Sequence, residues 1–490
     1  MSIHRARTCV GVVAAAAVSV LAAAPAWALE EIVRLSPAED PTGSNGFGFP
    51  VGISGSTIVV GASFDPPGLS GAAYVFVRDG LNWVQEAKLK PSDLQPNAFF
   101  GTAVAIDGER MVVGAPFIHF DFRGLGFAYV FRREGDTWIE EAKLVSSDSH
   151  EGDSFGHAVD IHGDWLVVGA PLDGFVIAEP AAYVFQRQGT QWIERARVTA
   201  DDPTSWSDFG WSVAIDDDLL VVGAPVDDGS ELNSGTVYVF RRDGIAWILE
   251  TKLDASDAAP GDAFAWSVYV DGDLLVVGAP GDDDAGAVSG SAYVFRRSAG
   301  LWSEESKLTA YDGFTSDEFG YAVGASTGTI VVGARLNDDS AKDSGSAYVF
   351  TDNTDSWELW GKLVASDAHV GQHVGNSVAL DALCSVIGAG RAAYVYWLGA
   401  QDNDCNDNCA DDAADIMEGT SIDCNANGTP DECEALPDAD GDGVSDCYDQ
   451  CAEVDDNLFA PDCNKAIPTL SGWGALIISL ILLVGGKVSS

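Results

Sequence analysis

Short apolar runs, separated by connections rich in Gly and Asp, recur four at a time along residues 30–398. In one unit they occupy residues 155–159, 165–169, 182–185 and 192–198. Each run has the length of a strand, and none is long enough for an ordinary helix. Asp-Gly pairs such as Asp107-Gly108 separate the first and second runs, where a two-residue hairpin needs positive backbone φ angles. The pattern therefore predicts units of four antiparallel strands.

Seven copies of this unit follow one another. Three markers recur at a constant spacing from one another: Val-Val-Gly-Ala, Tyr-Val-Phe and a single Trp. Val-Val-Gly-Ala is degenerate in the last copy. Self-similarity at this period is typical of a propeller or a solenoid, and four antiparallel strands make one propeller blade. The glycines of Val-Val-Gly-Ala, 53 to 55 residues apart, are Gly61, Gly114, Gly169, Gly223, Gly278, Gly333 and Gly388.

The ends of the repeat region predict how the ring closes. The seventh copy stops after three strands, near Leu398, and lacks the strand that carries Trp in the other copies. Residues 30–35 match 140–144 in phase, so an N-terminal strand can complete the last blade and leave no open sheet edge. We therefore expect an all-β, seven-bladed propeller, closed by its N-terminal strand, over residues 29–398.

The repeated markers resemble the FG-GAP repeat of integrin α-chains and of many exported bacterial proteins. Phe-Gly opens five copies, and Phe264-Ala265 and Val374-Gly375 replace it in the other two. This resemblance implies recognition of proteins or glycans more often than catalysis. Integrin blades often hold calcium in an Asp-rich loop between the first two strands, but the hairpins here are too short for that loop. The second marker, Gly-Ala-Pro, stands in four copies, at residues 114–116, 169–171, 223–225 and 278–280.

Acidic residues also follow the second strand in several copies. Repeated on successive blades, they would form one acidic rim, because equivalent loops of a propeller lie on the same face. Clustered carboxylates suit hard cations, so one interpretation is a weak calcium-dependent contact surface. The other is that they are solvated turn residues that keep the propeller soluble. The candidates are Asp227, Asp228, Asp282, Asp283, Asp284, Asp338 and Asp339.

The tryptophans fall into two groups. One Trp per copy at the same strand position predicts packing between blades. Trp206, Trp211 and Trp266 break this phase and lie near the start of adjacent copies. They are the better candidates for a patch that faces a ligand.

Composition separates the propeller from the remainder of the chain. The 490 residues carry 26 Lys+Arg and 75 Asp+Glu, a net charge of −49, which argues against nucleic acid as a partner. Residues 399–466 hold 20 of these acids and a single Lys, together with seven of the nine cysteines. We therefore expect a separate small module, with cations balancing its charge. Cys384, in the last blade, is expected to be a buried free thiol.

Two loops in this module have the ligand spacing of an EF-hand calcium loop, with oxygen donors at positions 1, 3, 5, 7, 9 and 12. Flanking helices are not expected, and the segment resembles thrombospondin type 3 repeats or dockerin loops. That resemblance implies a stalk in which Ca²⁺ and disulfides replace a hydrophobic core; the alternative is a disordered acidic linker. The predicted ligands are Asp438, Asp440, Asp442, Val444, Asp446 and Asp449, and Asp423, Asn425, Asn427, Thr429, Asp431 and Glu434.

Both ends of the chain look like targeting segments. Residues 1–28 combine early Arg residues, an apolar stretch and Ala26-Trp27-Ala28, which is typical of a cleaved secretory signal. Residues 467–490 resemble the IPTL-type C-terminal sorting signal of bacterial exported proteins. This implies an apolar transmembrane helix that holds the protein at the membrane until a sorting protease acts. A permanent anchor is the alternative.

The sequence contains no recognisable local catalytic motif, so we do not expect an enzyme. It favours an exported adhesion or recognition protein at the cell surface that binds an extracellular protein or polysaccharide. Two alternatives remain open. One is a self-assembling structural component of an envelope or matrix, and the other is a glycan-active enzyme whose acids come from different blades.

Overall fold

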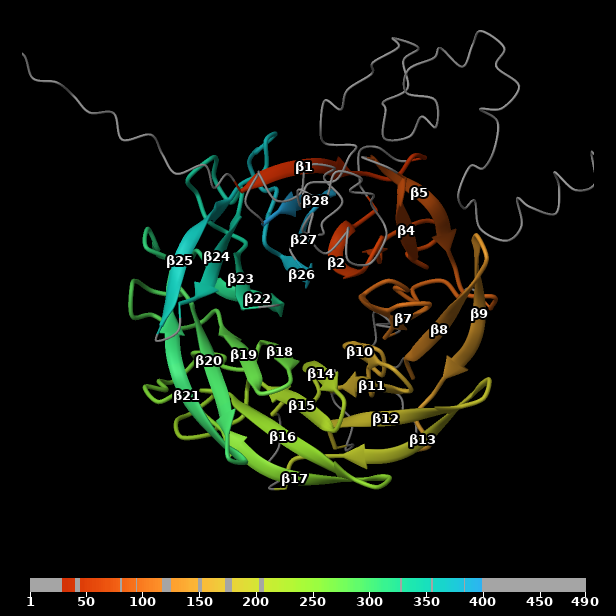
Figure 1. Cartoon of the computed structure of the whole chain (residues 1–490), viewed down its shortest axis with the longest axis horizontal. Coiled ribbons are helices and arrows are strands. Elements are labelled where there is room, and N and C mark those ends of the chain that lie inside the picture. Colours follow the sequence, from red (N-terminus) through yellow and green to blue (C-terminus); the bar gives the residue numbers. More distant parts are fainter. Residues whose placement is uncertain are drawn as a thin grey trace, which may run out of the picture. The chain divides into compact units, whose positions relative to one another are not determined.

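The computed structural model describes residues 29–398 except 40–44, 80–81, 94, 117–124, 149–151, 172–178, 202–206, 327, 354–355 and 383. These residues form 28 strands in seven four-stranded antiparallel sheets. Figure 1 shows the sheets arranged as blades of a ring, with one strand of each blade near the centre and one at the rim. The predicted all-β, seven-bladed propeller is confirmed.

Six blades are each built from four consecutive strands, which run in order from the innermost to the outermost. Blades 1 to 3 contain β2 (Phe47–Ser54), β3 (Thr57–Ala62), β4 (Ala72–Asp79) and β5 (Asn82–Leu89); β6 (Ala103–Asp107), β7 (Arg110–Ala115), β8 (Phe127–Glu134) and β9 (Thr137–Leu144); and β10 (Val159–His162), β11 (Trp165–Ala170), β12 (Ala181–Gln188) and β13 (Gln191–Val198).

Blades 4 to 6 repeat this order. They contain β14 (Ser212–Asp216), β15 (Leu219–Ala224), β16 (Thr236–Asp243) and β17 (Ala246–Leu253); β18 (Ser267–Asp271), β19 (Leu274–Ala279), β20 (Ser291–Ser298) and β21 (Leu301–Leu308); and β22 (Phe319–Ser326), β23 (Thr329–Ala334), β24 (Ser346–Asp352) and β25 (Trp357–Leu363).

The seventh blade joins the two ends of the repeat region. Its strands are β26 (Ser377–Asp381), β27 (Cys384–Ala389), β28 (Ala392–Trp397) and, outermost, β1 (Glu30–Leu35). β1 pairs antiparallel with β28, and its register shifts between Glu31 and Val33. The other outer strands shift register at the equivalent point, for example opposite Val184 and Phe185. The predicted closure by the N-terminal strand is therefore confirmed in its register as well.

The core consists of seven hydrophobic clusters, each drawn from two adjacent blades. Trp83 lies in the cluster between blades 7 and 1, and Trp247 lies in the one between blades 3 and 4. Trp357 occupies the same place between blades 5 and 6. Trp138, Trp192 and Trp302, on outermost strands, pack against three further clusters. The tryptophans that recur once per copy therefore pack between blades, as predicted.

The two glycine markers meet where adjacent blades touch. Gly101, after Phe100, has a φ of 92°, and a Cβ on it would lie 2.2 Å from the carbonyl oxygen of Ala72. A Cβ on Gly61 of Val-Val-Gly-Ala would lie 2.2 Å from the carbonyl oxygen of Gly101 itself. Side chains at these positions would force the blades apart, so the close approach of the two backbones requires glycine.

One expectation within the propeller is wrong. Cys384, at the start of β27, is disulfide-bonded rather than a free thiol. It is the only cysteine among the described residues, so its partner lies outside them. Burial had suggested a free thiol, but the odd number of cysteines after residue 399 was the better signal, because Cys384 makes that number even.

Several other predictions lie outside the described residues. These are the signal segment 1–28, both calcium loops with their ligands, and the sorting signal at 467–490. Among the described residues, no helix is long and apolar enough to cross a membrane. By its internal contacts the chain divides into two units, Met1–Asp402 with Asp407–Cys409, and Asn403–Asn406 with Ala410–Ser490.

Candidate functional site

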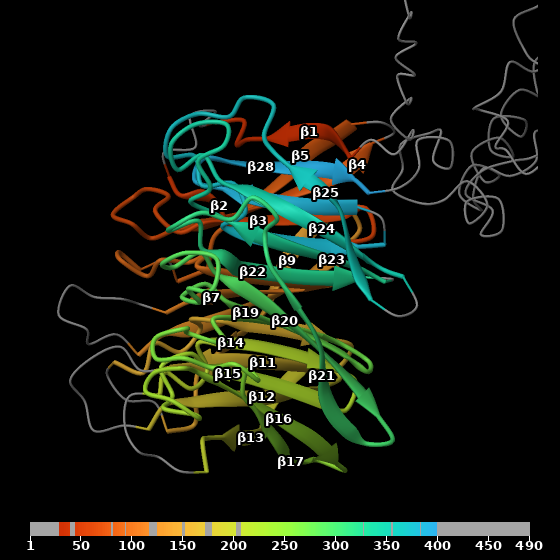
Figure 2. The ribbon, with the colours of Figure 1, turned by 90° about the vertical axis from the view of Figure 1, so that its left-hand side faces the viewer.

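The longer connections of the propeller lie on one face, which we call the loop face. They follow the second and the fourth strand of each blade, and they project together on the left-hand side of Figure 2. The opposite face, which we call the hairpin face, carries the short turns that follow the first and third strands. Loops on a rigid scaffold are where binding residues concentrate, so the loop face is the first place to look for a site.

The acids predicted as weak cation ligands lie on the loop face, and several are bonded to lysine and tyrosine. In blade 5, the Lys307 ammonium lies 2.7 Å from Asp257, 2.8 Å from Asp282 and 2.6 Å from Asp284. The hydroxyl of Tyr293 donates to Asp257 and to the buried Asp282, at 2.8 and 3.0 Å. The three carboxylates are close enough together to hold a metal ion. In this structure a lysine of the chain itself bonds to all three and offsets part of their negative charge.

The same arrangement recurs in other blades. Lys362 is bonded to Asp312, at 2.9 Å, and to Asp339. Lys143 pairs with Asp93, and the guanidinium of Arg34 pairs with Asp367 at 3.1 Å. The remaining predicted acids cap turns, bond to tyrosine or face solvent: Asp227 accepts from the Tyr238 hydroxyl, Asp228 from the Asn233 amide and Asp338 from the Asp343 amide, and Asp283 is exposed.

These contacts set the protonation of the blade 5 cluster. Burial alone would lower the pKa of Lys307, but hydrogen bonds to the three aspartates and to Tyr293 raise it above its usual range. Burial would raise the pKa of Asp257, but Lys307 and Tyr293 hold it below its usual value. A calcium ion here must displace a charged ammonium. The Lys or Arg that recurs near the end of each fourth strand was a signal for this partner that the sequence reasoning missed.

A row of aromatic side chains, which we call the aromatic row, crosses blades 3 to 6. The rings of Trp211 and Trp266 have centroids 4.7 Å apart. His157 lies 4.5 Å from Trp211 on one side, and Tyr321 lies 5.5 Å from Trp266 on the other. All four side chains are partly exposed. The structure therefore brings together two of the three predicted ligand-facing tryptophans; the third, Trp206, lies outside the described residues.

The repeat explains why the row is continuous. Each of its members directly follows the Phe-Gly pair, or Phe264-Ala265, at the start of the inner strand, so equivalent positions of adjacent blades lie side by side. His157 and Tyr321 were missed because aromatic residues were sought as Trp alone. In the blade 1 copy the same position is Phe49, whose ring contacts Phe64, and Phe64 in turn contacts Phe99.

The ends of the row differ in polarity. Burial lowers the pKa of His157 to about 4, so this imidazole is neutral at pH 7. At the other end, the guanidinium of Arg335 lies 3.6 Å from the centre of the Tyr321 ring and pairs with Glu318 at 2.5 Å. The row thus presents ring faces and edges, with the guanidinium of Arg335, paired with Glu318, at one end. Such a surface suits flat, weakly polar ligand groups.

Comparison with protein families supports the assignment suggested by the markers. A model of the FG-GAP repeat matches residues 30–76, 83–131, 138–185, 192–240, 247–295 and 302–350. The chain belongs to the FG-GAP repeat family. Each matched FG-GAP segment begins in the outer strand of one blade and ends in the third strand of the next. The last copy, with its degenerate markers, is not matched, yet it forms a complete blade with β1.

Other comparisons add little to the family assignment. None of the curated proteins matches this FG-GAP chain. Among solved structures it is similar to the computationally designed protein Ika8, with 16% sequence identity and a TM-score of 0.43. That match covers 75% of this chain and 99% of the designed one.

Proposed function

We propose that this protein is an exported recognition protein, held at the cell surface, that binds an extracellular protein or polysaccharide through the loop face of its FG-GAP propeller. The aromatic row is the observation that carries this proposal. Its rings belong to the inner ends of four blades, so the scaffold fixes them before any ligand arrives. Preformed aromatic surfaces contribute much of the binding energy in recognition sites, because little side-chain entropy is lost when they are covered.

The export part of the proposal rests on the two terminal segments, and the stalk on the acidic module. In this proposal, Ca²⁺ held by the two predicted loops stiffens the segment between the propeller and the membrane. The helix at 467–490 anchors the protein until a sorting protease acts on it. The disulfide at Cys384 supports an oxidising compartment, since such bonds persist outside the cytosol.

Binding of the purified protein to wall polysaccharides, extracellular proteins and intact cells tests the proposal, with calcium and then with a chelator. The double variant Trp211→Ala, Trp266→Ala should lose at least tenfold in affinity for whatever the wild type binds. Leu301→Ala is the matched control, because Leu301 is highly exposed at the start of β21, away from the row.

Each outcome separates the proposal from its alternatives. Saturable binding that the double variant loses and the control keeps supports recognition through the row. Equal binding by both variants contradicts it. Concentration-dependent assembly of the wild type without any foreign ligand would favour the self-assembling structural component instead.

A further inference from the structure

Short turns on the hairpin face are linked across four blade boundaries by one repeated hydrogen bond. The residue before the turn accepts a hydrogen bond from the turn glycine of the following blade. Ser54 accepts from the Gly108 amide at 3.0 Å, and Asp107 accepts from the Gly163 amide at 2.6 Å. Asp216 and Asp381 accept in the same way from Gly272 and Gly55. An acceptor followed by glycine is therefore the structural norm at this position.

Blades 3 and 4 depart from this norm at the same contact. His162 stands where other blades have the Asp or Ser acceptor, and Asp217 stands where most blades have the turn glycine. Asp217 has a φ of 46°, close to the 53° of Gly108. The two departures face each other across one blade boundary, whereas the other replacements of the turn glycine, Thr327 and Ala382, come one blade after an ordinary Asp or Ser.

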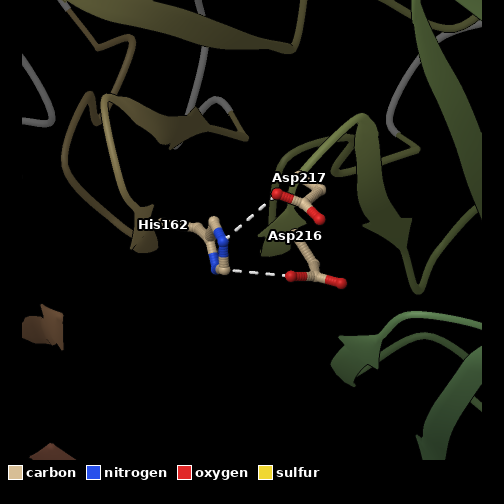
Figure 3. Close-up of side chains that lie close together, drawn as sticks. All are labelled: His162, Asp216 and Asp217. Atoms are coloured by element: carbon tan, nitrogen blue, oxygen red, sulfur yellow. Dashed lines mark ion pairs between the residues drawn. The ribbon is translucent and has the colours of Figure 1, made fainter.

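The two departures create a group of metal-ligating atoms. His162 Nδ1 lies 3.3 Å from Asp216 Oδ1, and Nε2 lies 3.5 Å from Asp217 Oδ1. Figure 3 shows both carboxylates facing the imidazole from the neighbouring blade. One ligand atom from each residue lies within 4.8 Å of the others. Ligands about 2.0–2.2 Å from a tetrahedral zinc ion are about 3.3 Å from one another. Because the two short distances involve different nitrogens of one ring, the exposed imidazole must turn until a single nitrogen faces both carboxylates.

The surroundings favour an added cation. In the blade 5 cluster Lys307 supplies the positive charge, but here the centre of the group is an imidazole. Burial raises the pKa of Asp271, and the charge of Asp216 raises it further. Asp271 is therefore a further acidic neighbour of Asp216.

Two arginines of blade 4 bond to groups other than these carboxylates. Arg241 pairs with Asp218 at 2.6 Å, and Arg242 donates to the backbone oxygen of Asp217 rather than to its carboxylate. Neither of these arginines therefore bonds to the carboxylate oxygens that face His162. Asp216 is also held in place, because its other oxygen accepts the Gly272 amide at 2.7 Å. A fixed carboxylate beside two exposed, adjustable ligands suits a metal that enters from solvent.

We propose that His162, Asp216 and Asp217 bind a divalent transition-metal ion of the zinc class, with water completing the coordination. The imidazole nitrogen decides the class: calcium and magnesium take oxygen ligands, whereas zinc, cobalt and nickel accept nitrogen together with carboxylate oxygen. The ion would bridge blades 3 and 4 at the hairpin face. This site differs in place and chemistry from the predicted calcium loops and is independent of the aromatic row.

Titration of the stripped full chain with Zn²⁺ and Co²⁺, by calorimetry and visible spectroscopy, tests this site. His162→Asp and Asp217→Gly each restore the residue that the repeat uses most often, so both variants should fold with an unchanged or higher melting temperature. Each should lose one equivalent of metal or bind it at least tenfold more weakly. His369→Ala, which removes an exposed histidine of a loop-face connection, should bind as the wild type does.

Two further readouts separate this site from others in the chain. The Co²⁺ spectrum of the lost equivalent should lack thiolate charge-transfer bands, which excludes the cysteines. Its binding should weaken as the pH is lowered, because groups that ligate a metal ion must be deprotonated. Equal metal stoichiometry and affinity in the wild type and in the double variant His162→Asp, Asp217→Gly would overturn the proposal. In that case the contact is an ion pair between the histidine and the two carboxylates only.

Discussion

Glu31 accepts hydrogen bonds from both the backbone amide and the hydroxyl of Ser366, at 2.7 and 2.8 Å, although 335 residues separate the two. Consecutive blades inside the chain use the same pair. Glu140 accepts from Ser92 across blades 1 and 2, at 2.7 and 2.9 Å. The closure of the ring therefore repeats the ordinary contact between blades, with the N-terminal strand in the place of a fourth strand.

Replacing Glu31 with Ala should weaken this closure. Two hydrogen bonds to an exposed carboxylate would be lost, so we expect the free energy of unfolding to fall by about 1 kcal/mol. Denaturant unfolding followed by tryptophan fluorescence measures it. Glu140→Ala, which breaks the same bonds between blades 1 and 2, is the matched control. An unchanged midpoint for Glu31→Ala would show that strand pairing alone closes the ring.

The Phe-Ala pair of blade 5 carries backbone strain. Ala265 replaces the marker glycine, is buried and has a φ of 72°, which side chains rarely adopt. Ala265→Gly should therefore raise the free energy of unfolding by roughly 0.5–1 kcal/mol. The reverse change in blade 4, Gly210→Ala, should destabilise, because a Cβ there would lie 2.5 Å from the carbonyl oxygen of Ala181. Thermal melts of both variants provide the comparison, and destabilisation by Ala265→Gly would contradict the strain.

The lysine of blade 5 holds together three carboxylates. Lys307→Met should lower the free energy of unfolding by about 2 kcal/mol, since the buried Asp282 would lose its charged partner. Millimolar Ca²⁺ should restore part of this loss in the variant, because the three carboxylates would then accept a cation in place of the ammonium. Lys342→Met is the control, as Lys342 is mostly exposed and its nearest acid, Asp343, is 3.7 Å away. A variant as stable as the wild type would show that the cluster contributes little.

A carboxyl in blade 3 predicts an unusual pH dependence. Burial raises the pKa of Asp160 to about 7, although the amides of Ile161 and Ile215 donate to its carboxylate. A raised folded-state pKa contributes stability that is complete below about pH 4 and is lost as the pH rises through 7. Relative to Asp160→Asn, the wild type should lose on the order of 2 kcal/mol between pH 4 and pH 7 and no more above it. A difference that stays constant above pH 5 would contradict the shift.

The acidic module gives a prediction outside the described residues. If both loops bind Ca²⁺, Asp442→Ala should remove one equivalent of calcium measured by calorimetry, and Asp446→Ala should do the same. Chelation should expose residues 399–466 to protease while the propeller remains folded. Loss of both parts together on chelation would show that the propeller itself depends on calcium.

The sequence by itself determined the architecture, because each blade is local in the chain. Four strands, their hairpins and their glycine markers fall within about 55 residues, and seven copies in one phase leave a closed ring as the arrangement without open edges. Even the long-range pairing of β1 with β28 could be predicted, since residues 30–35 matched the missing strand of the repeat.

Only the tertiary structure decided what the side chains between blades do. Residues about 50 apart meet there, and their partners depend on loop geometry that no spacing reveals. The acids at Asp282 and Asp284 could be read from the sequence as a cation site or as solvated turns, but not as partners of Lys307. In the same way, His162 and Asp217 look like minor departures from a repeat until the ring places them on opposite sides of one blade boundary. Strand pattern fixes the scaffold, whereas the chemistry at its surfaces follows from contacts that form only when the ring is closed.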